Sequence, residues 1–371
     1  MFNVLHIMSG AGAGGISSVV ANYYQFINRD KIHFDALIAD NEIGINGRRL
    51  LDLGCDIYIG CPLKSNDYNG YIKFVSHRLA NGCYDAIHVH ENETSWVALK
   101  VAKELGVNCR IAHAHTAGVH KGGIRKYLKN VTGQCLNYLY ATNVIACGEL
   151  AGNYVFGRRN MHRKKAIILP NAIDTDVYRF MPQIRKEMRH ILDCENNFVI
   201  GMVGRVAYPK NNVRALELFK TILDIIPNAK LILAGDGEDM NKVKNKIKDL
   251  CIEQNVLLLG NRSDVNYLYQ AFDVYMLPSL FEGFPVAAIE AMASGLPVLL
   301  SDTITKELSF GTAVHYLSLN DDLAWGMMAK AYINDSEREE RSAEVKNRDL
   351  DIRDTSKILE SVYLQYSKQS H

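Results

Sequence analysis

Short apolar segments alternate with amphipathic segments along this chain, and the alternation occurs twice. In the first half, the apolar pattern predicts strands at 2–8, 33–39, 85–90, 110–115, 143–147 and 167–169, and helical periodicity covers 16–27, 94–105 and 124–140. In the second half, it predicts strands at 197–203, 230–235, 255–259, 273–277, 297–301 and 314–317, with helices near 211–226, 238–253, 263–271 and 285–294. Such alternation is typical of α/β proteins, in which helices cover both faces of a parallel sheet.

The two sets of elements meet at a joint around 170–196, where Leu169-Pro170-Asn171 ends the first set and a polar stretch precedes the next strand. Beyond residue 318 the strands stop, and the chain ends with a predicted helix at 354–368. A chain of 371 residues is also long for a single core. We therefore predict two doubly wound, Rossmann-like domains facing each other across a cleft, with ligands at the carboxyl ends of the strands.

Composition excludes several classes of protein. The formal net charge of +1 gives no reason to expect nucleic acid as a partner. No run of eighteen apolar residues is present, and the first residues lack a basic segment, so they are predicted to form a strand and not a signal peptide. The 8 cysteines include no Cys-x-x-Cys pair, which indicates reduced thiols, a cytoplasmic protein and no zinc site.

One segment departs from this neutral balance. Between residues 121 and 165 a single acid, Glu149, stands among many bases, which are Lys121, Arg125, Lys126, Lys129, Arg158, Arg159, Arg163, Lys164 and Lys165. The segment is either a solvated face or a patch that meets an anionic membrane surface or a diphosphate-bearing lipid acceptor.

The N-terminal glycine loop fits a dinucleotide-binding pattern. Gly10, Gly12 and Gly15 match G-x-G-x-x-G between a strand and a helix, and Asp40 closes the next strand. Asp40 comes about ten residues later than the usual spacing of about 20. Three interpretations stay open: an NAD-dependent enzyme, a turn that binds nothing, and a loop near a donor or acceptor phosphate.

The most informative segment is 278–298, where a strand ends, a loop follows and a helix begins near Pro285. The backbone amides of Gly283, Phe284 and Val286 would form the positive end of that helix, which suits a diphosphate. Glu282 precedes the helix and Glu290 lies about 8 Å along it. Two carboxylates so placed can accept hydrogen bonds from hydroxyls of one extended ligand.

Other strand ends of the second half carry further candidates. Gly204 and Arg205 follow one strand, and Arg205 with Lys210 could neutralise a pyrophosphate without a metal ion. Two more strands end in short polar loops that could line a base pocket, with the candidate residues Asp236, Gly237, Asn261 and Arg262. Asp174-Thr175-Asp176 could be read as a metal-binding Asp-x-Asp, but its place in the joint favours a turn and a helix cap.

Four histidines of the first half lie in pairs on two predicted strands. His88 and His90 share one strand face, and His113 and His115 share another. A metal site is conceivable, but no carboxylate or cysteine pattern accompanies the histidines. We expect His115, at a strand end, to point into the cleft and His113 to be structural.

Together, these residues resemble the retaining GT-B glycosyltransferases of family 4, including bacterial exopolysaccharide and capsule enzymes. The resemblance covers nearly the whole chain, and its most specific part is Glu282 and Glu290 within Phe-Glu-Gly-Phe-Pro…Glu-Ala-Met-Ala-Ser-Gly-Leu-Pro-Val. It implies a helix at 354–368 that crosses back, and hence an acceptor-side domain of residues 1–175 with 354–371 and a donor-binding domain of 176–353. Ala172 and Pro285 depart from the glycines common at these positions.

The resemblance also implies roles. Arg205 and Lys210 would hold the donor diphosphate, Glu290 the ribose, and Glu282 the transferred sugar. His115 would lie beside the reacting sugar, and Gly14-Gly15 would shape the acceptor side and meet the donor phosphates.

The implied reaction moves a hexose or N-acetylhexosamine from a nucleotide diphosphate sugar, with UDP as the preferred nucleotide, to an acceptor hydroxyl with retention. The acceptor would be a saccharide or lipid-linked saccharide in exopolysaccharide or capsule synthesis, at the cytoplasmic face of a membrane. No cofactor or metal is expected. A sugar-nucleotide 2-epimerase and a non-catalytic partner subunit on the same fold are the alternatives.

Overall fold

The computed structural model describes residues 1–12, 15–39, 42–60, 68–118, 123–309, 311, 313–346 and 350–367. The chain divides into two compact units: unit 1 comprises Met1–Ala172 with Ile352–His371, and unit 2 comprises Ile173–Asp351. The boundaries expected from the sequence, after residue 175 and before residue 354, lie within a few residues of this division. Among the described residues, no helix is long and apolar enough to cross a membrane.

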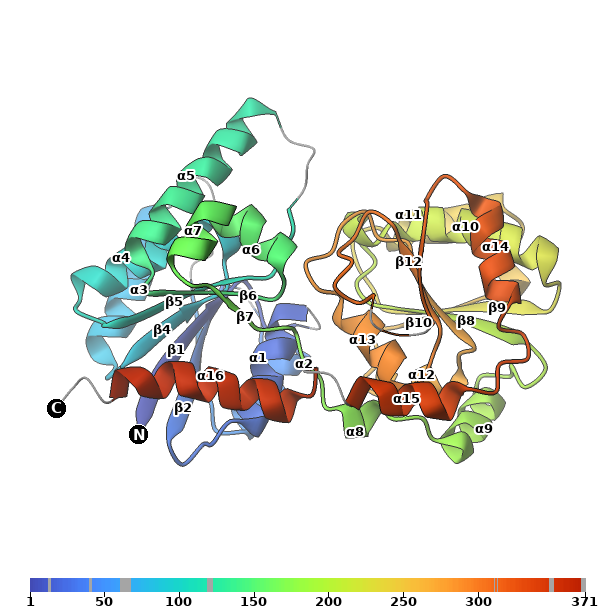
Figure 1. The fold of residues 1–371 in the computed structure, drawn as a ribbon, viewed down its shortest axis with the longest axis horizontal. Coiled ribbons are helices and arrows are strands. Elements are labelled where there is room, and N and C mark those ends of the chain that lie inside the picture. Colours follow the sequence, from blue (N-terminus) through green and yellow to red (C-terminus); the bar gives the residue numbers. More distant parts are fainter. Residues whose placement is uncertain are drawn as a thin grey trace. The chain divides into compact units, whose positions relative to one another are not determined.

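Unit 1 is built on a parallel sheet with the strand order β3-β2-β1-β4-β5-β6-β7 (Figure 1). Its strands are β1 (Phe2–Met8), β2 (Ile32–Ile38), β3 (Ile57–Ile59), β4 (Ala86–Val89), β5 (Cys109–Ala114), β6 (Asn143–Ala146) and β7 (Ile167–Ile168). Its helices are α1 (Gly15–Phe26), α2 (Ile45–Asp52), α3 (Tyr68–Asn81), α4 (Trp96–Glu104), α5 (Ile124–Tyr140), α6 (Glu149–Phe156), α7 (Arg158–Arg163) and α16 (Ile352–Ser367), with a 3-10 turn, η1, at Asn92–Thr94.

The last helix, α16, returns to unit 1 and packs against α1 and β1 (Figure 1). Its apolar residues at helical spacing, Leu359, Val362 and Tyr363, are buried, and Tyr363 has no exposed surface. The sequence predicted this helix at 354–368. The terminal segment therefore completes the core of the first half of the chain.

Unit 2 is a second parallel sheet, with the strand order β10-β9-β8-β11-β12-β13. Its strands are β8 (Phe198–Val203), β9 (Ala229–Ala234), β10 (Val256–Gly260), β11 (Val274–Leu277), β12 (Val298–Ser301) and β13 (Val314–Leu317). Its helices are α8 (Thr175–Tyr178), α9 (Pro182–Ile191), α10 (Asn212–Ile225), α11 (Met240–Asp249), α12 (Val265–Ala271), α13 (Val286–Ala293), α14 (Asp322–Lys330) and α15 (Arg338–Lys346), with 3-10 turns η2 (Tyr208–Lys210) and η3 (Glu253–Asn255). The two parallel sheets confirm the predicted α/β architecture.

Five elements of unit 1 and two of unit 2 escaped the sequence analysis. The missed elements of unit 1 are β3, α2, α3, α6 and α7. Of these, β3 is an edge strand of three residues, too short for a periodic pattern. The predicted polar joint contains α8 and α9, and α9 packs on α12. Mostly polar α9 buries little more than Met188 and the side chain of Arg189, so its apolar signal is weak. The expectation of a helix cap at Asp174 is confirmed, because its carboxylate accepts the Asp176 N–H at 3.2 Å.

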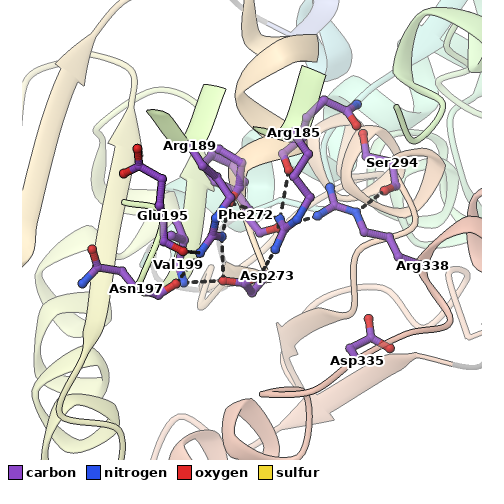
Figure 2. Close-up of polar contacts among 12 residues, drawn as sticks. Arg185, Arg189, Glu195, Asn197, Val199, Phe272, Asp273, Ser294, Asp335 and Arg338 are labelled. Carbon is purple, nitrogen blue, oxygen red and sulfur yellow. Dashed lines mark hydrogen bonds and ion pairs between the residues drawn. The ribbon is translucent and has the colours of Figure 1, made fainter. Parts of the chain in front are cut away.

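A cluster of arginines joins α9, α12, α15 and the start of β11 within unit 2 (Figure 2). Arg185 and Arg189 each donate to the Asp273 carboxylate, at 2.5 and 3.0 Å, and to backbone carbonyls at the end of α12. Arg338 donates to the carbonyls of Tyr269, Phe272 and Ser294, at 2.6, 2.5 and 2.9 Å. These carbonyls lie at helix C-termini, which lack intrahelical donors, so the arginines cap α12 and α13.

Candidate active site

The predicted donor-site residues of unit 2 gather at the carboxyl ends of its parallel strands. Gly204 and Arg205 follow β8, Gly235 and Asp236 follow β9, and Ser279 comes two residues after β11. Because all strands are parallel, these ends share one edge of the sheet.

The loops after β8 and β9 approach each other closely. The Gly204 N–H donates to the Ala234 carbonyl at 2.9 Å, and the Val206 N–H donates to the Asp236 carbonyl at 3.0 Å. Gly235 has φ of +145°, and a Cβ there would lie 1.9 Å from the Gly204 oxygen. Only glycine fits at this contact, which holds the two loops together at the sheet edge.

The loops after β8 and β11 are also joined. The Leu280 N–H donates to the Pro209 carbonyl at 2.9 Å, and the Asn211 side-chain amide donates to the Pro278 carbonyl at 3.1 Å. Asn211 itself has a positive φ of 56°. This joint places the ends of Lys210 and Glu282 beside each other.

Lys210 and Glu282 form a partly buried ion pair. The Lys210 Nζ donates to Glu282 Oε1 at 2.7 Å, and the Ser279 hydroxyl donates to the same oxygen at 2.7 Å. Their side chains are 23% and 15% exposed. Within the described part of the chain, Glu282 Oε2 has no hydrogen-bond partner and Lys210 has no partner besides Glu282. Both groups therefore retain capacity for a ligand.

Glu290 is the fifth residue of α13, and two tyrosines hold its carboxylate. The Tyr178 hydroxyl donates to Oε1 and the Tyr269 hydroxyl to Oε2, each at 2.8 Å. Burial raises the pKa of Glu290, whereas the two hydroxyls and the positive charge of Lys210 act to lower that pKa. The sequence analysis identified Glu290 but missed both tyrosines, Asn211 and Ser279, since no local pattern marks a residue that supports another.

The loop before α13 leads directly from Glu282 into the helix. Gly283 and Phe284 are buried, and Val286 is the first helical residue. Pro285 is the N-cap residue and not, as expected, part of the first turn. The first amides of a helix lack intrahelical acceptors, so this end can receive a negative group beside Glu282.

A pocket of about 450 Å³ lies beside the end of β9 and contains two of the predicted residues. It is lined by Asp236, Gly237, Glu238, Met240, Asn241, Lys244, Leu258 and Gly260. Asn261 and Arg262, which follow Gly260, are exposed, and Arg262 donates to Asp264 at 2.8 and 2.6 Å. Exposed Arg205 donates to Glu238 at 3.0 Å, so Arg205 lies at the rim of this pocket.

The remaining predicted residues belong to unit 1. Gly14 lies outside the described residues. Gly15 begins α1, and a Cβ on Gly15 would meet nothing within 4 Å. Upstream in the same loop, the Gly12 carbonyl accepts the Ser17 hydroxyl and the Asn46 amide, both at 2.8 Å.

His115 follows β5 and belongs to a larger group of histidines than the sequence indicated. His90 Nδ1 and His115 Nε2 are 2.8 Å apart, and His113 bonds to His88 at 3.1 Å. His6, from β1, was missed, although it occupies the same register on the sheet as His88. Three donor nitrogens lie within 4.8 Å of one another in two sets, which are His6 with His88 and His90, and His90 with His113 and His115.

Comparison with known proteins shows the family of this chain. A sequence profile of the family "Glycosyl transferases group 1" matches residues 184–307, a range that includes Lys210, Glu282 and Glu290. The glycosyltransferase EpsF of Bacillus subtilis (strain 168) is 31% identical over 326 residues, which are 86% of this chain and 85% of EpsF. An Escherichia coli UDP-Gal:alpha-D-GlcNAc-diphosphoundecaprenol alpha-1,3-galactosyltransferase is 31% identical over 231 residues, covering 59% of this chain and 58% of that enzyme.

Solved structures share the fold. Anabaena HepE in complex with UDP-glucose superposes with a TM-score of 0.79 at 17% identity, over 100% of this chain and 99% of HepE. Sucrose-phosphate synthase from Thermosynechococcus elongatus superposes with a TM-score of 0.74 at 16% identity, over 100% of both chains. The chain therefore has the GT-B fold and belongs to the group 1 glycosyltransferases.

Proposed function

We propose that this chain is a retaining glycosyltransferase that moves a hexose or N-acetylhexosamine from a UDP-sugar to a hydroxyl of a lipid-linked saccharide. The observation that carries the proposal is the edge of the unit 2 sheet, where Lys210 and Glu282 form an ion pair with unused bonding capacity and Glu290 is held by two tyrosines in the adjoining helix α13. UDP-glucose in the HepE structure, and the lipid-linked acceptor in the name of the E. coli relative, support the donor and acceptor classes.

In this proposal, each group has a chemical task. Lys210 and Arg205 stabilise the charge that grows on the departing diphosphate, helped by the amides at the start of α13. Glu290, kept in place by Tyr178 and Tyr269, accepts hydrogen bonds from the ribose hydroxyls. The pocket beside Asp236 takes the uracil base.

Glu282 accepts hydrogen bonds from hydroxyls of the transferred sugar through its free Oε2. In this proposal Glu282 has no role as a nucleophile; its Oε1 oxygen accepts hydrogen bonds from Lys210 and Ser279. Retention would instead follow from attack on the same face from which the diphosphate leaves, with a diphosphate oxygen taking the acceptor proton. Because two cations supply the positive charge, we expect turnover to persist in EDTA.

Kinetics of matched variants test the site. We expect Lys210→Ala and Glu290→Gln to lower turnover by about 10²–10³-fold, the usual loss when one group that stabilises a developing charge is removed. Lys220→Ala and Glu253→Gln are the controls, because both wild-type residues are exposed and lie on other elements of unit 2. Circular dichroism checks folding, and near-normal rates in Lys210→Ala and Glu290→Gln would contradict the assignment.

Binding and product assays test the substrate class. Saturating UDP or a UDP-sugar should raise the melting temperature, since a ligand at 100 times its Kd adds about 2.7 kcal/mol of stability. Stabilisation by NAD(P) alone would instead assign the Gly10–Gly15 loop to a dinucleotide. Donor conversion in the absence of any acceptor would indicate an epimerase, and binding without turnover on lipid-linked saccharides would indicate a non-catalytic subunit.

We further propose that unit 1 meets an anionic membrane through α5 and α7. One face of α5 exposes an apolar stripe at a spacing of four residues: Tyr127, Val131, Cys135 and Leu139, with Leu128 beside it. Exposed bases accompany it at Lys129, Arg158, Arg159, Arg163 and Lys165, whereas Lys121 and the side chains of Arg125 and Lys126 lie outside the described residues. Apolar side chains that enter the interface, together with bases for acidic headgroups, fit a lipid surface.

Vesicle flotation tests this surface. Binding should require anionic lipid, weaken with salt and be lost in Tyr127→Ser/Leu128→Ser. Leu323→Ser is the control, because Leu323 is equally exposed, at 62%, but lies on α14 of unit 2. Equal binding to neutral and anionic vesicles would contradict the electrostatic part of the proposal.

A further inference from the structure

The segment that follows β4 contains a residue with a left-handed backbone. β4 ends at Val89, and the turn η1 begins at Asn92, whose φ is +52°. Few residues other than glycine adopt this region, although asparagine and aspartate tolerate it. Such a backbone persists where the surrounding contacts hold it, so the contacts of Asn92 indicate what the residue does there.

The side chain of Asn92 binds the main chain of His115. Asn92 Oδ1 accepts the His115 backbone N–H at 2.9 Å. Because a backbone N–H can only donate, the contacting atom must be the carboxamide oxygen. The residues of β5 that pair with β4 end at Ala112, and those that pair with β6 end at Ala114, so His115 lies beyond the sheet ladder. Asn92 therefore supplies an acceptor where the neighbouring strands no longer provide one.

The ring of His115 is bound from the same segment. His90 Nδ1 and His115 Nε2 are 2.8 Å apart, and His90 stands two residues before Asn92 in the sequence. The segment after β4 thus contacts His115 twice, once at the ring and once at the main chain. The main-chain contact fixes where the residue lies, and the ring contact restricts the direction in which the imidazole points.

The turn itself is supported by helix α5. The Asn137 carboxamide donates to the Asn92 carbonyl at 3.0 Å, and Asn137 has no exposed surface. Gly133, one helical turn earlier, approaches so closely that a Cβ there would lie 2.4 Å from the Glu93 carbonyl oxygen. A side-chain acceptor on a turn that is held in this way has a defined place, which is what the support of a functional group requires.

We propose that Asn92 is a positioning residue for His115: its carboxamide oxygen holds the residue after β5 so that the imidazole stays beside the reacting sugar. The hydrogen bond is independent of what the protein does. The effect on catalysis rests on the proposed function and on the place beside the sugar that we give to His115. Since small displacements of a group near the reacting atoms lower the rate, the loss of this bond should reduce turnover.

Two substitutions of Asn92 separate its acceptor from its backbone. Asn92→Gly removes the acceptor and keeps the left-handed backbone, which glycine adopts freely. Asn92→Asp keeps both the acceptor and the tolerance for this backbone. Cys251→Gly is the matched control, because it places a glycine at another left-handed position, with φ of +53°, on an exposed residue of unit 2.

Kinetics with named substrates measure the effect. The donors are UDP-glucose and UDP-galactose, and the acceptor is α-D-GlcNAc-diphosphoundecaprenol, after the ligands named for HepE and the E. coli relative. We expect Asn92→Gly to lose about tenfold in kcat, the value of one hydrogen bond, with the KM of the donor unchanged. Asn92→Asp and Cys251→Gly should keep the wild-type rate. An equal loss in Asn92→Asp and Asn92→Gly would overturn the role of the acceptor.

A double-mutant cycle distinguishes positioning from a general effect on the fold. If Asn92 acts through the imidazole, Asn92→Gly should cause no further loss of kcat in a His115→Ala background, whereas independent effects multiply. A tenfold loss in both backgrounds would contradict the positioning role. If the wild type converts neither donor, the proposed function fails and the catalytic role fails with it.

Amide hydrogen exchange tests the hydrogen bond without reference to activity. Labelling with 15N-histidine limits the amide signals to the 12 histidines, and His115→Ala identifies the signal of His115 by its loss. We expect the His115 N–H to exchange about tenfold faster in Asn92→Gly than in the wild type, Asn92→Asp or Cys251→Gly. Equal exchange in Asn92→Gly and the wild type would show that the hydrogen bond does not hold His115, whatever the kinetics.

Discussion

Each unit of the molecule buries one extended polar network, and the two networks are built on opposite principles. The network of unit 1 consists of five histidines and Tyr363, all neutral and joined by hydrogen bonds. The network of unit 2 consists of guanidiniums around Asp273 (Figure 2). Burial lowers the pKa of the histidines in unit 1 and of Arg338 in unit 2, but an arginine stays protonated because its ordinary pKa is far above neutrality.

The difference teaches what each kind of burial requires. A neutral imidazole needs no counter-charge, but its nitrogens prefer hydrogen-bond partners and it remains sensitive to pH. A buried guanidinium needs many fixed acceptors, which here are helix-end carbonyls and one carboxylate. Neither network resembles the sheet edge of unit 2 that carries Lys210 and Glu282. There, the polar groups retain hydrogen-bonding capacity that the protein does not use.

The largest expected difference between the two networks is a loss of folding stability in acid, which should affect unit 1. Five clustered histidines of unit 1, which are His6, His88, His90, His113 and His115, each have a folded-state pKa below the unfolded value of 6.5. The unfolded chain therefore binds protons that the folded unit cannot. The stability that these histidines contribute is complete above pH 6.5 and declines as pH falls, by up to about 1.4 kcal/mol per pH unit for each histidine. Unit 2 should withstand the same change.

Fluorine NMR can follow the units separately, because each contains one tryptophan, Trp96 in α4 and Trp325 in α14. With 5-fluorotryptophan, the folded resonance of Trp96 should disappear first between pH 6.5 and 5, and Trp96→Phe assigns it. Earlier loss of the Trp325 resonance would reverse the comparison.

A smaller effect on folding stability is expected from removing the Asp273 carboxylate of unit 2. Asp273→Ala would leave Arg185 and Arg189 without their shared counter-charge and the Val199 N–H without its acceptor. Breaking a buried pair in this way costs about 3–5 kcal/mol. The measurement is urea unfolding followed by Trp325 fluorescence.

Asp224→Ala is the control for that measurement. Asp224 pairs with Lys220 on the surface of α10, at 62% exposure, and such pairs contribute at most about 1 kcal/mol. Equal losses in the two variants would mean that the arginine cluster is held by its carbonyl contacts alone.

The smallest effect comes from Glu91 of unit 1, whose contribution to folding stability changes with pH in the direction opposite to that of the histidines. Burial raises the pKa of Glu91 to about 7, and Tyr71 donates to the Glu91 carboxyl at 2.5 Å. The folded unit therefore holds a proton that the unfolded chain releases, and this contribution to stability declines as pH rises from about 4.5 to 7. Glu91→Gln should make the acid loss of unit 1 steeper by up to about 1.4 kcal/mol per pH unit.

The same fluorine titration of Trp96 measures this change. Glu104→Gln, an exposed carboxylate on α4, is the control and should leave the slope unaltered. A shallower slope in Glu91→Gln would show that its carboxyl is ionised in the folded unit.

The order of strands and helices, the two-part division and the family were open to prediction from the sequence, because each depends on local information. Period-2 and period-3.6 patterns arise within single elements, and the segment from Pro278 to Val298 presents its glycines, prolines and acids in one continuous run. Even Asp174 could be recognised as a cap, because its acceptor and the Asp176 N–H are two residues apart. Short or polar elements such as β3 and α9 were missed because their local signal is weak.

Only the tertiary structure decided which distant residues meet. Tyr178 reaches Glu290 across 112 positions, and Tyr363 reaches His88 across 275 positions. No periodicity encodes such pairs, since they depend on strand order and on where a terminal helix packs. The sequence by itself therefore determined most of the elements, the polar residues at the strand ends of unit 2 and the family. Packing decided that four of the predicted histidines, together with His6 and Tyr363, form one hydrogen-bonded chain, because a hydrogen bond requires proximity in space and not in sequence.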